Sequence, residues 1–138
     1  MKTKIHSIPE TMDTYWVSDV NAVLDVWKTN TITQKDLDEA LLIDGINQLK
    51  TNHGNAFILD SSETTNPLTT EMQTHLGKDV FPSLANNGVK YFITVPPKQK
   101  NQTRTPIKNL TTNPGPNGIQ LLEVNNQEDA IEWLKLHR

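Results

Sequence analysis

Cysteine is absent from the 138 residues of this chain. Without a thiol, the protein has no disulfide framework, no thiolate nucleophile and no cysteine-based zinc site. No apolar run approaches the roughly 20 residues that a membrane-spanning helix needs, and the N-terminus has no apolar stretch typical of a signal peptide. We therefore expect a cytoplasmic protein without a membrane span.

Glycine patterns that cradle phosphates are also missing, because the six glycines fall singly at expected turns and caps. This excludes nucleotide binding by a P-loop or Rossmann mode. The net charge is −3, so the chain is a poor candidate for binding nucleic acid, which requires neutralising phosphates. Residues 96–118 nevertheless form a basic flap without carboxylates, expected to be solvated or to meet an anion or acidic partner, with the cations Lys98, Lys100, Arg104 and Lys108.

Short apolar blocks between Thr- and Asn-rich turns predict one α/β domain over residues 1–138. Thr33, Thr69 and Asn125 or Asn126 are expected helix caps, and Pro82 should kink or divide the second helix. The expected strands are 14–18 and 22–28 as a hairpin, 56–59, 89–95 and 119–124, with an edge strand at 4–8. The expected helices are 33–50, one from 69 to about 86, one from 126 onward and one or two turns at 105–110.

Four local features follow one another along nearly the whole chain. They are Leu24–Lys28 leading to Asp36-Leu37, the strand end Leu59-Asp60, the passage from Phe81-Pro82 to Gly88-Val89, and the close Glu128-Asp129-Ala130-x-x-Trp133-Leu134. In this order they resemble the SpoIIAA-like branch of the STAS superfamily. The resemblance and the element order imply an α/β fold with a mixed, mostly parallel sheet of 4–5 strands and helices packed mainly on one face.

In the anti-sigma antagonists of that superfamily, a serine at the start of the second helix is phosphorylated. The corresponding run here is Leu68-Thr69-Thr70-Glu71, in which threonine replaces the serine and Glu71 replaces a glycine. We expect Thr69 to cap the helix, and phosphorylation of Thr69 or Thr70 is the alternative.

Asp60, Ser61, Ser62 and Glu63 follow the predicted central strand, where open α/β sheets place ligands. They form either a binding site or a turn in which Asp60 and Ser62 bond backbone amides. A triad of Asp60, His75 and Ser61 or Ser62 is the least favoured alternative, because no nucleophile elbow exposes either serine.

Histidines show no spacing typical of a metal site, so neither a metal nor a cofactor is expected. Glu71 and His75 share a helix face and form an exposed charge pair, with an acid/base pair or two metal ligands as the alternatives. His6, His53 and His137 are expected to be solvated.

The first helix has more apolar residues than one stripe needs, which predicts an exposed partner surface at Leu37, Leu41 and Leu42. Together with the resemblance, this predicts a non-enzymatic regulatory module that binds a protein partner and allows a homodimer. The alternative is a carrier or sensor of an apolar small molecule or lipid, which requires a preformed cavity of about 300 Å³ near the first two helices. A hydrolase is the third and weakest reading.

Overall fold

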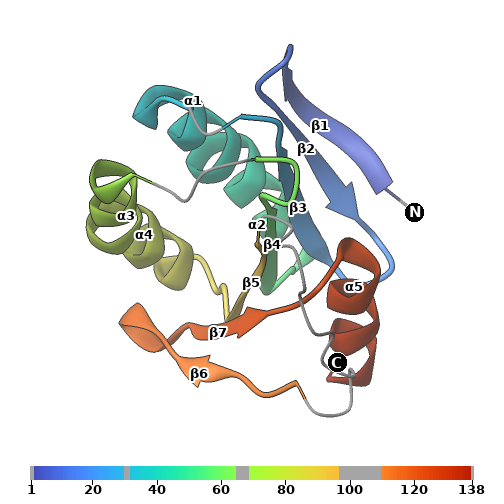
Figure 1. Ribbon diagram of the computed structural model, residues 1–138. Coiled ribbons are helices and arrows are strands. Elements are labelled where there is room, and N and C mark those ends of the chain that lie inside the picture. Colours follow the sequence, from blue (N-terminus) through green and yellow to red (C-terminus); the bar gives the residue numbers. More distant parts are fainter. Residues whose placement is uncertain (1, 30–31, 65–68, 97–109, 138) are drawn as a thin grey trace.

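The computed structural model describes residues 2–29, 32–64, 69–96 and 110–137. The described residues form one mixed sheet and five α-helices (Figure 1). The strands are β1 (Lys2–Ile8), β2 (Met12–Val17), β3 (Ala22–Trp27), β4 (Ala56–Asp60), β5 (Tyr91–Val95), β6 (Asn113–Pro114) and β7 (Gln120–Glu123). The α-helices are α1 (Gln34–Asp38), α2 (Ile46–Asn52), α3 (Thr70–His75), α4 (Phe81–Asn86) and α5 (Gln127–Leu136).

The sheet contains seven strands in the order β1-β2-β3-β4-β5-β7-β6, so the prediction of 4–5 strands is wrong. Strands β3, β4, β5 and β7 pair in parallel, whereas β1, β2 and β3 pair antiparallel and β6 returns antiparallel to β7. Edge strand β1 confirms the edge strand predicted at residues 4–8, whereas edge strand β6 was not predicted. Edge strand β6 has only two residues, one of them Pro114, and is too short to produce an alternating hydrophobic pattern.

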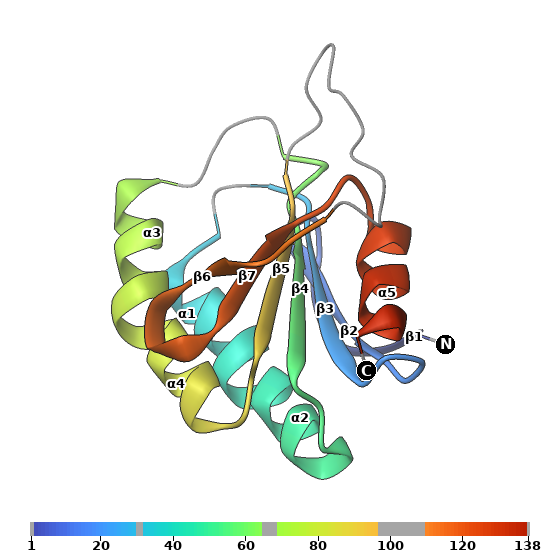
Figure 2. The ribbon, with the colours of Figure 1, turned by 90° about the horizontal axis from the view of Figure 1, so that it is seen from below.

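Helices cover both faces of the sheet. In Figure 2, α1 to α4 lie on one side of the strands and α5 lies on the other. Two apolar clusters follow this division: one contains Leu37, Phe57 and Phe92, and the other contains Ile58, Ile93 and Trp133. All five residues of β4 are buried, as expected for a central strand with a covered layer on each side.

The first long helix runs as α1, a π-helical segment η1 (Glu39–Gly45) and α2. Leu37 and Leu41 are completely buried, and Leu42 is partly buried against the same core. A π-helical turn is wider than an α-helical turn, which keeps Leu41 and Ile46 on the core face although they are five residues apart. The surplus of apolar residues thus reflects helix geometry, and these leucines do not form the predicted exposed partner surface.

The second long helix consists of α3, a π-helical segment η2 (Leu76–Val80) and α4. Its core residues Met72, Leu76, Val80 and Leu84 follow at intervals of four and are all buried. In a regular α-helix such a row drifts by about 40° per step, and the wider turn of η2 reduces that drift. Pro82 lies in the first turn of α4, directly after η2, in agreement with the predicted division of the helix.

The predicted caps are confirmed. Thr33, Thr69 and Asn126 each accept a backbone N–H with the side chain at the start of α1, α3 and α5. His53 adopts a left-handed conformation, with φ of 56°, and ends α2 before Gly54.

Part of the predicted flap is ordered structure. Residues 113–114 form β6, and the turn at Pro116–Gly118 contacts α4. Gly115 is required here because a Cβ atom would lie 2.6 Å from Cγ of Leu121. The cations Lys98, Lys100, Arg104 and Lys108, and nearly all of the helical turn predicted at 105–110, lie outside the described residues.

Candidate functional site

The loop after β4 is held by its own polar side chains. Oδ1 of Asp60 accepts the backbone N–H of Ser62 at 2.9 Å, and Oδ2 accepts from Nε2 of Gln127 on α5. The hydroxyl of Ser61 donates to the carbonyl of Val95 at 3.0 Å. This agrees with the interpretation of Asp60 as a turn-forming residue, while Glu63 is exposed and a ligand role for this loop remains a prediction.

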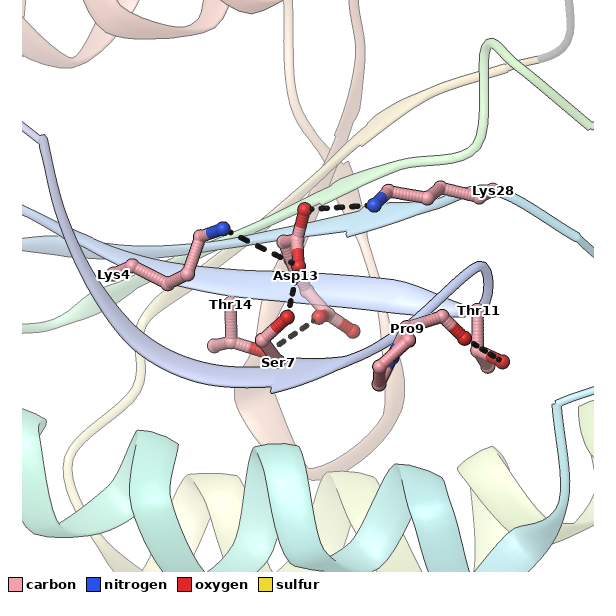
Figure 3. Close-up of polar contacts among 8 residues, drawn as sticks. Lys4, Ser7, Pro9, Thr11, Asp13, Thr14 and Lys28 are labelled. Carbon is pink, nitrogen blue, oxygen red and sulfur yellow. Dashed lines mark hydrogen bonds and ion pairs between the residues drawn. The ribbon is translucent and has the colours of Figure 1, made fainter.

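A second polar cluster, on β1, β2 and β3, was not found from the sequence (Figure 3). Asp13 accepts a hydrogen bond from Ser7 at 2.6 Å and pairs with Nζ of Lys28 at 3.0 Å and of Lys4 at 3.7 Å. The hydrogen bond from Ser7 and the two lysines hold the pKa of Asp13 below its usual value, against the effect of burial. The carboxylate is thus well compensated within the protein.

Asp25 on β3 is completely buried. Its carboxylate accepts hydrogen bonds from Oγ1 of Thr14 and Nε1 of Trp27, both at 2.7 Å. Burial raises the pKa of Asp25 to about 6, although both hydrogen bonds lower it. Nearby, Nδ1 of His6 lies 2.6 Å from Oδ2 of Asp44 in η1. His6 is therefore partly buried and paired, and is not the solvated residue that we expected.

His75 joins the two long helices. Its Nε2 lies 2.7 Å from Oδ1 of Asp38, and its Nδ1 lies 2.9 Å from Oδ2 of Asp79. Both ring nitrogens are therefore occupied, and the side chain is only 7% exposed. The hydrogen bonds of a Ser–His–Asp60 triad are not formed, and the acidic partner of His75 on its own helix is Asp79 instead of Glu71.

Beside His75 lies an open, mostly polar hollow of about 360 Å³ between α1 and α3, lined by Gln34, Thr70, Glu71, Thr74, His75, Lys78 and Asp79. Thr69 accepts the backbone N–H of Met72 at 3.1 Å, which confirms its role as a cap. Thr70 is exposed at the rim of the hollow. Nothing in this arrangement tests phosphorylation of either threonine.

An apolar pocket of about 350 Å³ lies between the second long helix and the far half of the sheet. Its apolar lining comes from β4, β5, β7 and the helix, through Leu59, Leu76, Phe81, Phe92, Leu121 and Leu122. Three polar residues complete the lining, namely Thr94, Asn113 and Glu123. The small-molecule alternative required a cavity near the first two helices, whereas this pocket is lined by the second long helix and the sheet and by no residue of the first. Its residues were not named from the sequence, because they come from five separate elements.

The pocket exists because of how the sheet edge is built. The helices α1 to α4 pack over β1 to β5, whereas β7 and β6 extend beyond them, and the turn after β6 returns to contact α4 (Figure 2). Phe81 meets Phe92 edge-to-face with ring centroids 4.9 Å apart, and Phe92 stacks on Phe57 at 5.7 Å. These rings form a rigid aromatic wall, as expected for interlocked aromatic pairs.

Within the part of the chain that the structure describes, no group of three or more His, Asp or Glu side chains is placed to hold a metal ion. Over the same residues, no helix has the length and apolarity needed to cross a membrane. Comparisons with family models, curated proteins and solved structures found no match to this chain. The site must therefore be interpreted from its own chemistry.

Proposed function

We propose that this protein is a non-enzymatic carrier or sensor that binds a small apolar molecule in the pocket between η2, α4 and strands β4, β5 and β7. The observation that carries the proposal is the cavity itself, about 350 Å³ and lined by six apolar side chains. An apolar cavity of about 150 Å³ in another protein binds benzene, so this one has room for a ligand about twice that size.

Binding through a protein partner was the leading expectation from the sequence. The residues that motivated it, Leu37, Leu41 and Leu42, belong to the core and offer no surface for a partner. The exposed large apolar side chains of the described residues are Ile43 and Leu136, which belong to different elements, η1 and α5. Isolated apolar side chains are normal on a protein surface and favour no partner.

Membership of the SpoIIAA-like branch of the STAS superfamily is likewise our proposal. The order of the parallel strands supports it, because β3 is joined to β4 and β4 to β5 through a long helix, and the three strands pair in parallel. Regulation by a small ligand is compatible with such membership, whereas fold alone does not specify function.

Blocking the pocket tests the proposal. Thr94 lies on its floor, and within the described residues its hydroxyl makes one hydrogen bond, a 3.5 Å contact with the carbonyl of Leu122. Thr94→Phe therefore fills the pocket without removing a strong hydrogen bond between described residues. Thr74→Phe is the matched control, because Thr74 is exposed beside the polar hollow. With propylbenzene as a neutral probe, we expect ligand-observed NMR to detect binding to the wild type and to Thr74→Phe, and none to Thr94→Phe.

The result that would contradict the proposal is equally specific. If propylbenzene at its solubility limit does not bind the folded wild-type protein, the pocket is not a site for apolar molecules. If it binds equally well to Thr94→Phe, it binds elsewhere on the protein. Native mass spectrometry of the protein from its own host's lysate would then show which small molecule, if any, is retained.

A further inference from the structure

Two of the three polar residues that line the apolar pocket, Thr94 and Glu123, lie side by side, whereas Asn113 pairs with Leu121 in the row of Phe92. Strand register places Leu59, Thr94 and Glu123 side by side on β4, β5 and β7. Side chains of paired residues in neighbouring strands point to the same face of a sheet, here the face that α3 and α4 cover. The floor of the pocket therefore changes from apolar at Leu59 to hydroxylic at Thr94 and anionic at Glu123.

Glu123 carries a negative charge that no cation of the described residues meets. It is exposed and forms no ion pair with any residue that the structure describes. Asp13, Asp38 and Asp79, in contrast, each meet a lysine or His75 within 4.0 Å. Among the described residues that line the pocket there is no lysine, arginine or histidine to receive an anionic head group.

The hydroxyl of Thr94 can also form a hydrogen bond with a ligand. Its only hydrogen bond within the described structure is the 3.5 Å contact to the carbonyl of Leu122, at the outer limit of hydrogen bonding. The hydroxyl can thus accept a hydrogen bond from a ligand beside the Glu123 carboxylate, which accepts as well. Both groups are suited to a head group that donates hydrogen bonds and is positively charged.

The opposite end of the pocket favours an aromatic body. Phe81 is half-buried at the wall and presents its ring beside Phe92. A third ring can pack edge-to-face on such a pair, which stabilises aromatic ligands beyond simple burial of area. The cavity volume of about 350 Å³ fits one ring with a short chain.

From this juxtaposition we propose that the pocket selects a small aromatic amine, with its ring against Phe81 and Phe92 and its ammonium group between Glu123 and Thr94. This inference rests on the proposed function, because it assigns a ligand class to the same pocket. Carboxylate and phosphate ligands are disfavoured, because their charge would face Glu123 and the described residues of the pocket lining include no compensating cation.

Three probes with the same ring and similar length separate the two proposals: propylbenzene, 2-phenylethylamine and 3-phenylpropionate. We expect the full-length protein to bind the amine about tenfold more tightly than the acid at low salt, with the neutral probe between them. Isothermal calorimetry or NMR titration measures the three affinities. Added salt should reduce the difference, because the carboxylate of Glu123 is exposed.

Glu123→Gln should bring the affinities of the amine and the acid together while leaving propylbenzene binding unchanged. Glu128→Gln is the matched control, because it removes one charge from an exposed glutamate on α5, across the sheet from the pocket. It should preserve the wild-type preference. A preference that survives in Glu123→Gln, or that is lost equally in Glu128→Gln, would overturn the role of Glu123.

The outcomes distinguish the two proposals. Binding of propylbenzene, together with equal or tighter binding of 3-phenylpropionate than of 2-phenylethylamine, overturns the ligand class and leaves the apolar pocket in place. Absence of binding by all three probes overturns the proposed function itself. Amine binding that persists in Thr94→Phe places the amine outside the pocket and also overturns the inference.

Discussion

Nε2 of His75 on α3 lies 2.7 Å from Oδ1 of Asp38 on α1. This contact links two helices through residues that are 37 positions apart in the chain. Each partner stands at the point where its helix changes from α to π geometry. π-Helical turns are rare and concentrate at functional positions. The residue after His75, Leu76, lines the apolar pocket, so this link holds one wall of the candidate site.

His75→Gln should destabilise the protein most at mildly acidic pH. Burial lowers the pKa of His75, but the hydrogen bonds to Asp38 and Asp79 outweigh burial and raise it overall. The resulting stability is fully present below about pH 6.5, where the unfolded chain is protonated, and is lost as pH rises through the folded pKa. We expect a cost of about 1 kcal/mol at pH 6, limited by the solvent-exposed carboxylates.

Urea denaturation of the wild type and His75→Gln between pH 6 and pH 9 measures this difference. His53→Gln, a change at an exposed histidine beyond α2, is the control and should show no such trend. A difference between wild type and His75→Gln that grows with pH would contradict the prediction.

Asp25→Asn should change how stability depends on pH. Burial raises the pKa of Asp25 to about 6, so the folded protein retains a proton that the unfolded chain releases near pH 4. The contribution of Asp25 to wild-type stability should therefore fall by about 2 kcal/mol as pH rises from 4 to 6. Asp25→Asn removes this contribution, and its stability should change less over the same range in urea denaturation.

Only the slope of unfolding free energy against pH tests this prediction. The absolute stability of Asp25→Asn also changes, because an asparagine amide cannot accept from both Thr14 and Trp27. Glu63→Gln, at an exposed carboxylate, should keep the wild-type slope. If Asp25→Asn and the wild type lose stability in parallel from pH 4 to 6, Asp25 does not retain its proton on folding.

Gly115→Ala should disrupt the β6–β7 edge of the pocket. The added Cβ would lie 2.6 Å from Cγ of Leu121 and 2.7 Å from the carbonyl oxygen of Ile119, so the strand pair must shift. We expect a loss of about 1–3 kcal/mol in the free energy of unfolding, as for other overpacked sites, and weaker binding of propylbenzene. Thermal unfolding and probe titration measure the two effects.

Gly77→Ala, in the helical wall of the pocket, is the substitution to compare with Gly115→Ala. It lies exposed in η2, and a Cβ atom there meets nothing within 4 Å. Alanine should stabilise the helix by roughly 0.5–1 kcal/mol and leave probe binding unchanged. Equal effects of the two substitutions would show that steric contact at Gly115 does not shape the pocket.

Thr69→Ala should cost about 1 kcal/mol in unfolding free energy, because it removes the side-chain acceptor for the backbone N–H of Met72. Thr69→Ser retains the hydroxyl and should be nearly neutral, as should Thr70→Ala at the adjacent exposed position. Chemical denaturation of the three variants checks the order. A larger loss for Thr70→Ala would mean that the cap is not the main role of this pair.

Local signals in the sequence predicted most of the regular elements. Thr33, Thr69 and Asn126 marked the helix starts because a short polar side chain can satisfy a free N–H only there. Alternation and apolar runs predicted the hairpin and the central strands. These features depend on neighbours within a few residues, which the sequence displays directly.

The π-helical segments could not be predicted, because hydrophobic periodicity was interpreted with α-helical geometry. Under that geometry the apolar residues of the first helix exceeded one stripe, and Leu37 and Leu41 were assigned to a surface although both are buried. The strict interval of four from Met72 to Leu84 was a signal of wider turns, but the signal could be interpreted only once the packed helix was known.

What the sequence determined by itself is the α/β class, the order of its principal elements and the residues that start and end its helices. Tertiary structure decided that Asp25 is completely buried, that His75 lies between two aspartates, and that Leu59, Thr94 and Glu123 share one row. Local conformation depends on adjacent residues, whereas a pocket forms where strand register and helix packing bring distant residues together.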